Sequence, residues 1–102
     1  MTPSTFSRKL VVVITESALE ATLAREVQAL GAHGYTVCDA RGKGSRGVRD
    51  ASWEADRNIR MEVICDEATA LLIAGALREK YYDHYAMALY VTDIAVLRPE
   101  KF

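Results

Sequence analysis

The chain has 102 residues, of which 50% are hydrophobic and 26% are charged, and this composition predicts one globular domain. Lys and Arg total 13 against 14 for Asp and Glu, which argues against a protein that holds nucleic acid or an anionic membrane through a general positive field. The longest apolar runs, Leu10–Ile14 and Ala86–Val91, are far shorter than the roughly 20 residues of a membrane span, and the N-terminus lacks a signal-peptide pattern. We therefore expect a cytoplasmic protein in which any basic site is local.

The first third of the chain predicts a strand followed by a helix. After a polar tail over residues 1–8, which we expect to be flexible, the run LVVVIT at residues 10–15 is apolar on both faces, as in a buried central strand. Ser17 and Glu20 then form a capping-box pattern, and Gly31 supplies a stop signal. Between them, apolar residues recur at helical spacing: Leu19, Leu23, Val27 and Leu30.

The remaining elements follow the same logic. YTVCDA at residues 35–40 predicts a second strand, and NIRMEVI at residues 58–64 alternates strictly between apolar and charged side chains, as a strand with one buried face does. Asp66 is a candidate N-cap for a second helix, and MALYVTDIAVL at residues 87–97 predicts a last strand. The second helix carries its own apolar stripe: Ala70, Ile73, Ala74, Leu77 and Tyr81.

The order β-α-β-β-α-β predicts an α+β, ferredoxin-like fold with a four-stranded antiparallel sheet and two helices on one face. The last strand is apolar on both faces, whereas two helices cover only one face of a sheet. We expect a second copy of the chain to cover the other face.

The two cysteines do not form a C-x-x-C pair. If the strands on either side of the glycine-rich segment pair with Ala40 near Ile59, Cys38 lies beside Met61 and roughly 13 Å from Cys65, too far for a disulfide. We expect both thiols to be buried, reduced and structural. The histidines also lack a partner at metal-ligand spacing and are expected to be solvated or capping residues: His33 and His84.

Residues 41–49 read RGKGSRGVR and contain the pattern G-x-G-x-x-G. No helical stripe follows, so a dinucleotide-binding fingerprint is excluded, and Lys43 precedes Gly44 rather than Ser or Thr, which excludes a Walker A loop. An anion-binding loop remains, with glycine N–H groups, a hydroxyl and basic side chains as donors. The alternative is a surface hairpin loop whose charges are only solvated.

The segment GAHGYTVCDARGKGSRGVRD at residues 31–50, followed by NIRMEV, resembles the PII-like signalling proteins of inorganic-carbon metabolism, of the SbtB type or the carboxysome-associated type (CPII). The resemblance spans about Lys9 to Leu97. It implies a single PII-like domain over residues 1–102 that forms a homotrimer and binds adenine nucleotides in clefts between subunits. A long T-loop would span about residues 42–57.

Carried over by position, the resemblance implies a nucleotide site with three parts. The nucleoside would contact Thr36 and Val37 of one subunit, and Arg98 would add a phosphate or carboxylate contact. The phosphates would meet the glycine-rich segment: Gly42, Lys43, Gly44, Ser45, Arg46 and Arg49. The neighbouring subunit would supply the segment Tyr85, Ala86, Met87, Ala88 and Leu89. Lys43 and Arg46 are the candidates for a bicarbonate site.

The short C-terminal tail of the sequence favours the carboxysome-associated branch, whose members resemble sensors of ADP or AMP together with bicarbonate. The function expected is regulatory rather than enzymatic, with no structural metal, and the T-loop would contact a bicarbonate transporter or another partner. Three alternatives remain: an SbtB-type sensor of cyclic AMP or AMP, a trimer of the CutA kind that binds divalent cations, and a slow ATP or ADP hydrolase. Carboxylates available for a Mg²⁺ ion in that last case are Asp39, Asp50, Glu54 and Asp56.

Overall fold

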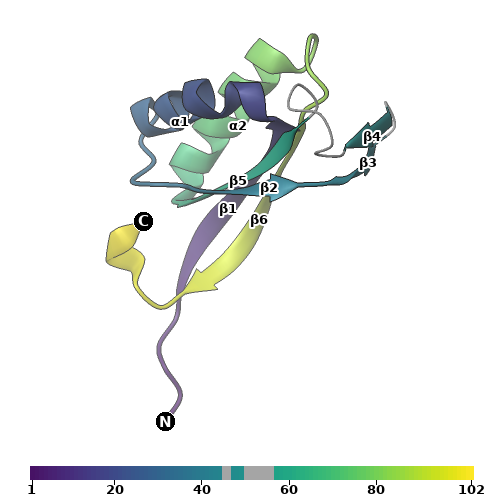
Figure 1. The fold of residues 1–102 in the computed structure, drawn as a ribbon. Coiled ribbons are helices and arrows are strands. Elements are labelled where there is room, and N and C mark those ends of the chain that lie inside the picture. The colour runs from purple at the N-terminus through teal and green to yellow at the C-terminus, as the bar shows by residue number, and fades with distance from the viewer. Residues whose placement is uncertain (45–46, 50–56) are drawn as a thin grey trace.

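Four strands pair in the order β2-β5-β1-β6, and all three pairings are antiparallel (Figure 1). The computed structural model describes residues 1–44, 47–49 and 57–102, and within them the strands are β1 Phe6–Glu16, β2 Thr36–Ala40, β5 Asn58–Cys65 and β6 Ala88–Val96. The apolar run of β1 lies in mid-sheet, between β5 and β6, as its hydrophobicity on both faces predicts. The expected ferredoxin-like arrangement is confirmed.

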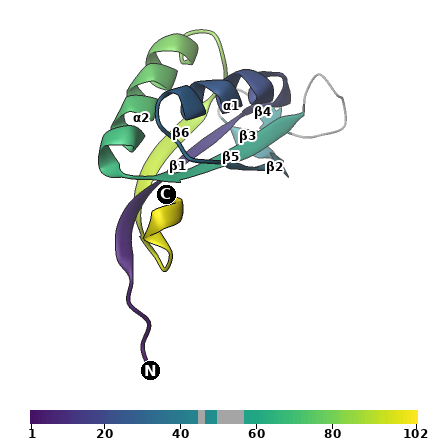
Figure 2. The ribbon, with the colours of Figure 1, turned by 90° about the vertical axis from the view of Figure 1, so that its left-hand side faces the viewer.

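Both long helices, α1 Glu20–Ala29 and α2 Glu67–Tyr81, lie on the same face of the sheet (Figures 1 and 2). Their apolar stripes meet alternate residues of β1 and β5, and this layer forms the hydrophobic core. Its fully buried side chains include Val11, Val13, Leu23, Val27, Met61, Val63, Ile73 and Leu77. Because side chains alternate along a strand, Val12 and Glu62 point to the opposite face, which we call the open face.

The start of α1 differs from the prediction. Residues Ser17–Leu19 form a short 3-10 turn, α1 begins only at Glu20, and its N-cap, Leu19, makes no side-chain hydrogen bond. The capping box predicted for Ser17 and Glu20 is therefore wrong. The backbone N–H of Ser17 instead donates to the carbonyl of Arg57 at 2.8 Å, which ties the exit of β1 to the residue before β5.

Two predicted helix signals are confirmed. The Asp66 side chain accepts a hydrogen bond from the backbone N–H of Thr69 at 2.8 Å, and this bond holds the pKa of Asp66 below its usual value. Gly31 has φ = 118°, a backbone conformation that is strained for residues with a side chain. A Cβ at this position would lie 3.4 Å from the hydroxyl of Thr69. The end of α1 thus meets the first turn of α2.

The first strand begins before the end of the tail that we expected over residues 1–8. Phe6, Ser7 and Arg8 already belong to β1 and pair with residues 96 to 94 of β6, beyond the end of β5. After β6, the 3-10 turn Pro99–Lys101 folds back below the open face (Figures 1 and 2). The Arg8 guanidinium donates to the Pro99 carbonyl at 3.2 Å and fastens this turn to β1. No helix in the described part of the chain is long and apolar enough to span a membrane.

The register of β2 against β5 differs by one residue from the prediction. Ala40 pairs with Asn58 rather than Ile59, so Cys38 lies opposite Arg60 and Val37 opposite Met61. The shift has a physical reason, because it places the β-branched Val37 on the core face and moves Cys38 to the open face. Cys65 is buried, which raises the pKa of its thiol, whereas Cys38 is exposed; both are free.

The glycine-rich segment continues from β2 as a short hairpin. β3, Gly42–Gly44, pairs with β4, Gly47–Arg49, with Gly42 opposite Arg49. In the described residues, the backbone of this segment pairs as two strands, and convergence of its N–H groups on an anion stays a prediction. Residues 45–46 and 50–56, which hold much of the predicted T-loop, lie outside the described residues.

Candidate functional site

A pocket of about 360 Å³ opens at the edge of the sheet formed by β2. Its walls come from four segments: the loop after α1, the first residue of β2, two open-face residues of β5 and the C-terminal turn. It is lined by His33, Gly34, Tyr35, Thr36, Glu62, Ile64, Lys101 and Phe102. Its volume is in the range of small-molecule sites, and it combines an aromatic and apolar lining with the side chains of one glutamate and one lysine.

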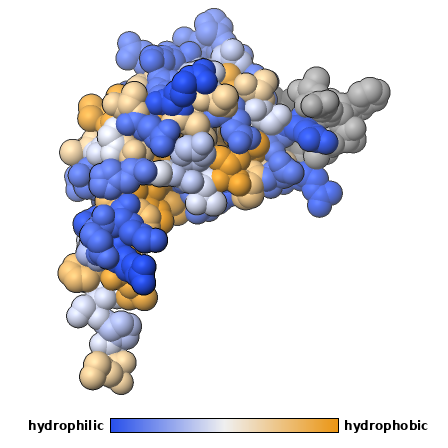
Figure 3. All heavy atoms as spheres, turned by 60° about the vertical axis from the view of Figure 1, so that its left-hand side comes forward, coloured by the Kyte–Doolittle hydropathy of each residue, from blue (hydrophilic) through white to orange (hydrophobic). Residues whose placement is uncertain are grey.

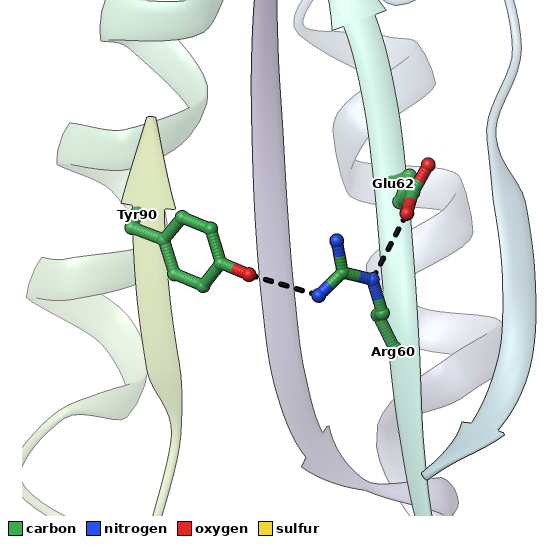
Figure 4. Close-up of polar contacts among 3 residues, drawn as sticks. All are labelled: Arg60, Glu62 and Tyr90. Carbon is green, nitrogen blue, oxygen red and sulfur yellow. Dashed lines mark hydrogen bonds and ion pairs between the residues drawn. The ribbon is translucent and has the colours of Figure 1, made fainter. Parts of the chain in front are cut away.

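The carboxylate of this pocket belongs to a three-residue contact across the open face, which we call the strap. Arg60 on β5 donates through Nε to Glu62 Oε2 at 2.9 Å and through a terminal nitrogen to the Tyr90 hydroxyl at 2.8 Å. The second bond crosses β1 to reach β6 (Figure 4). The hydrogen bond to Glu62, followed by the one to Tyr90, raises the pKa of Arg60. The strap therefore connects the pocket at the β2 edge of the sheet with β6 at the opposite edge.

The predicted nucleoside contacts lie on both edges of the sheet. Thr36 is exposed at the start of β2 and lines the pocket, while Val37 is partly buried against the core. The segment expected from a neighbouring subunit, Tyr85–Leu89, precedes and begins β6 at the opposite edge. With β5 and β1 in between, the two edges are roughly 14 Å apart within one chain.

The Tyr85–Leu89 segment is anchored to the core rather than free. Tyr85 meets Tyr81 edge to face with ring centroids 5.7 Å apart, and its N–H donates to the Tyr81 carbonyl at 2.9 Å. Met87 is buried, and Leu89 packs against the core. Tyr81 itself donates its hydroxyl to Glu26 at 2.8 Å, and burial followed by this bond raises the pKa of Tyr81 to about 12.

The predicted phosphate ligands are only partly described. Gly42 is exposed, and Lys43, Gly44 and Arg49 occupy the paired strands β3 and β4. Ser45 and Arg46, and with Arg46 half of the proposed bicarbonate pair, lie outside the described residues. The segment follows β2 directly, so the pocket at Thr36 and the basic residues lie along one sheet edge.

The structure gives less support to the predicted ligand contact of Arg98 and to a Mg²⁺ site. Arg98 is exposed and precedes the C-terminal 3-10 turn, where it does not line the pocket. In the part of the chain that the structure describes, no group of three His, Cys, Asp or Glu residues could hold a metal ion. Asp39 is exposed, and the other three carboxylates considered for Mg²⁺ lie outside the described residues.

Sequence reasoning missed most of the pocket. The alternation of β5 separates Arg60 and Glu62 from the core side chains, so the sequence indicates that Glu62 points away from the core. The predicted register, shifted by one residue, placed Val63 rather than Glu62 opposite Thr36. Lys101 and Phe102 reach the pocket only because the chain turns back after β6. Pro99 is the local sequence signal that predicts a turn at this position.

The described chain has a four-stranded antiparallel sheet, two helices on one face, a glycine-rich hairpin after the edge strand β2 and an adjoining pocket. These features define a ferredoxin-like chain with a pocket of small-molecule size. The model of the nitrogen regulatory protein P-II family matches residues 8–101, and the chain belongs to this family of regulatory proteins. The resemblance to PII-like proteins is confirmed.

Solved structures agree with this assignment. A PII-like signalling protein from Thermus thermophilus is 46% identical, with a TM-score of 0.84 over 97% of this chain and 98% of that chain. CPII from Thiomonas intermedia, bound to ADP and bicarbonate, is 24% identical, with a TM-score of 0.88 over 99% of both chains. The B. subtilis GlnK–ATP complex is 14% identical, with a TM-score of 0.64 over 86% of this chain and 82% of that chain.

Proposed function

We propose that this PII-like regulatory protein binds an adenine nucleotide, ADP or AMP, together with bicarbonate, in clefts between the subunits of a homotrimer. Its signal passes through residues 42–57 to a cytoplasmic partner, and a bicarbonate transporter is the partner we favour. Nucleotide binding in this scheme changes the affinity for the partner rather than driving a chemical reaction.

The separation of the two predicted half-sites carries the proposal. Thr36 lies at the β2 edge and Tyr85–Leu89 at the β6 edge, and β5 and β1 hold them apart. Both segments are predicted to contact the nucleoside, which is shorter than the roughly 14 Å between the two edges of one chain. The β2 edge of one copy beside the β6 edge of another would bring the two halves together. The open face, with Tyr90 45% exposed, provides further surface for such contacts.

Charge supports an anionic ligand. Four basic residues, Arg41, Lys43, Arg46 and Arg49, fall within residues 41–49 of a chain whose net charge is −1. Arginine presents forked donors that match phosphate geometry. The relatives suggest the ligands: CPII structures hold ADP and bicarbonate, or ADP, AMP and bicarbonate, and the GlnK structure holds ATP.

The proposal is tested by calorimetric titration of the purified chain with ADP, AMP, ATP and cyclic AMP, each with bicarbonate or with chloride at equal ionic strength. We expect ADP or AMP and bicarbonate to strengthen each other by about 1–3 kcal/mol, a factor of 5–150. ATP should show weaker coupling, because its additional phosphate competes for the same donors. The fluorescence of Trp53, the single tryptophan of the chain, reports on the T-loop in the same samples.

Each part of the proposal has its own failing result. Identical ADP affinity with and without bicarbonate would remove the carbon-sensing role and leave a nucleotide sensor. Stronger binding of cyclic AMP than of ADP would favour the SbtB-type alternative. Steady ADP formation during incubation with ATP would favour a hydrolase. Light scattering that returns the mass of one chain in the presence of nucleotide would contradict the intersubunit site.

A further inference from the structure

Glu62 lies where a ligand that contacts Thr36 must meet it. The two residues are direct partners in the β2–β5 ladder, and both line the pocket. The Cβ atoms of such partners lie about 4.5–5.5 Å apart, so a ring that touches the Thr36 side chain is within reach of the Glu62 carboxylate. Among the pocket residues, Glu62 supplies the carboxylate and Lys101 the ammonium group.

The strap limits what this carboxylate can bind. Arg60 already balances its charge through the 2.9 Å bond at Oε2, and the Tyr90 hydroxyl holds the guanidinium from across β1 (Figure 4). A carboxylate has about four acceptor positions, so capacity for further hydrogen bonds remains. The pocket therefore favours a neutral hydrogen-bond donor over a cation, and it presents that acceptor in a fixed orientation.

The charges along β2 set the direction of a nucleotide. A carboxylate repels phosphate, and Glu62 lies beside Thr36 at the start of β2. The basic segment begins at the other end of this strand, where Gly42 follows Thr36 by six residues, roughly 20 Å of extended chain. The phosphates therefore lie towards the basic segment, and the base lies at Glu62.

Bases differ in what they offer to such an acceptor. Adenine presents the 6-amino group as a donor beside the acceptor N7, whereas guanine presents two acceptors, O6 and N7, on the same edge. A pocket that holds a carboxylate acceptor and an ammonium donor can pair with the first arrangement, whereas two acceptors on one edge would repel the carboxylate. We propose that Glu62, oriented by Arg60 and Tyr90, selects adenine over 6-oxopurines by accepting a hydrogen bond from the 6-amino group. This inference rests on the proposed nucleotide function.

The test compares ADP with inosine diphosphate (IDP), in which an oxygen replaces the 6-amino group, by titration of the assembled full-length protein. We expect ADP to bind 10–150-fold more tightly than IDP, the range for a hydrogen bond to a charged group. Glu62→Gln should reduce this ratio to within about threefold, because an amide both donates and accepts. Tyr90→Phe keeps the Arg60–Glu62 pair and loses only its anchor, so the ratio should fall by a smaller factor.

Glu100→Gln is the matched control, because it removes an exposed carboxylate of the C-terminal turn that does not line the pocket, and its ratio should stay that of the unaltered protein. A second arm needs no variant: ADP with a dimethylated 6-amino group lacks the N–H donors and should bind as weakly as IDP.

Equal affinity of the unaltered protein for ADP and IDP, or full discrimination by Glu62→Gln, would overturn the role of Glu62. Failure of both nucleotides to bind the unaltered protein would instead refute the proposed function itself, and with it this inference.

Discussion

The two faces of the sheet are completed in different ways. On the face with the helices, α1 and α2 bury alternate residues of β1 and β5 in a closed apolar layer, where Val13 and Met61 have no exposed surface. On the open face, a polar strap, a turn of the C-terminal chain and exposed side chains such as Tyr90 take the place of helices. On the side seen in Figure 3, hydrophobic side chains lie in separate groups among hydrophilic ones.

This difference separates stability from function. In the described residues, the helix-covered face buries its apolar side chains within one chain. The open face and the two sheet edges hold the pocket, the strap and the predicted binding segments. Substitutions on the two faces should therefore have effects of different kinds.

The largest expected effect comes from a charge on the open face. Thr92 is exposed on β6 opposite Leu10, on the side away from the helices. In the proposed homotrimer, Thr92→Arg would bury an unpaired charge, which costs on the order of several kcal/mol, and the assembly should dissociate into folded single chains. Light scattering measures the mass and circular dichroism the fold. Thr22→Arg, on the exposed side of α1, should leave the mass unchanged; equal masses for both variants would remove the open face from the interface.

The next effect tests the closed face. Leu77→Ala leaves a cavity in the core beneath α2 and should lower the free energy of unfolding by about 2–5 kcal/mol. Leu72→Ala makes the same change on the same helix, but that side chain is 57% exposed, and the loss should stay within about 0.5 kcal/mol. Urea unfolding of both at one protein concentration gives the difference. Similar losses would mean that Leu72 is also covered, by a surface between copies.

A third prediction concerns residues on neither face. If the arginines of the glycine-rich segment bind phosphate, Arg46→Ala or Arg49→Ala removes charge-assisted hydrogen bonds worth about 1.5–3 kcal/mol, and ADP affinity should fall 10–150-fold. The unfolding free energy without nucleotide should hardly change. Titration and urea unfolding of the same preparations compare the two quantities. Unaltered ADP affinity in both variants would favour the alternative interpretation, in which this segment is a surface hairpin whose charges are only solvated.

The smallest effect lies in the contact between the helices. Tyr81→Phe removes the hydrogen bond to Glu26 and should cost about 1 kcal/mol. Since burial and this bond raise the pKa of Tyr81 to about 12, the folded chain retains a proton that the unfolded chain loses near pH 10. The unfolding free energy of the original protein should thus fall between pH 10 and 12, and that of the Phe variant should fall less steeply. Parallel curves would show that Tyr81 does not contribute.

Much of the fold could be predicted because its determinants are local. The alternation in β5 and the Asp66 cap depend on neighbours within a few residues, and both were predicted correctly. The pairing of β2 with β5 was also predicted, but its register was wrong, since one residue of uncertainty in a hairpin register exchanges the two faces of a strand. Cys38 was consequently expected in the core.

The candidate site was harder to predict because it joins distant parts of the chain. Thr36 was predicted from the resemblance to PII-like proteins and lines the pocket. The strap instead requires Arg60 to reach across β1 to Tyr90, 30 positions away, and Lys101 enters only through the turn after β6. Such contacts follow from the assembled sheet and leave no periodic pattern in the sequence.

The free edges of the sheet have a consequence for how binding is measured. In the described chain, β2 and β6 are its outermost strands, and a contact of the β2 edge of one copy with the β6 edge of another is head-to-tail. Such a contact closes into a ring only at the right rotation angle. Under the proposed function, each closed junction would form one nucleotide-binding cleft. Ligand occupancy and ring closure obey mass action together, so the apparent nucleotide affinity should weaken on dilution of the protein, and added nucleotide should hold the ring together at concentrations where it would otherwise open.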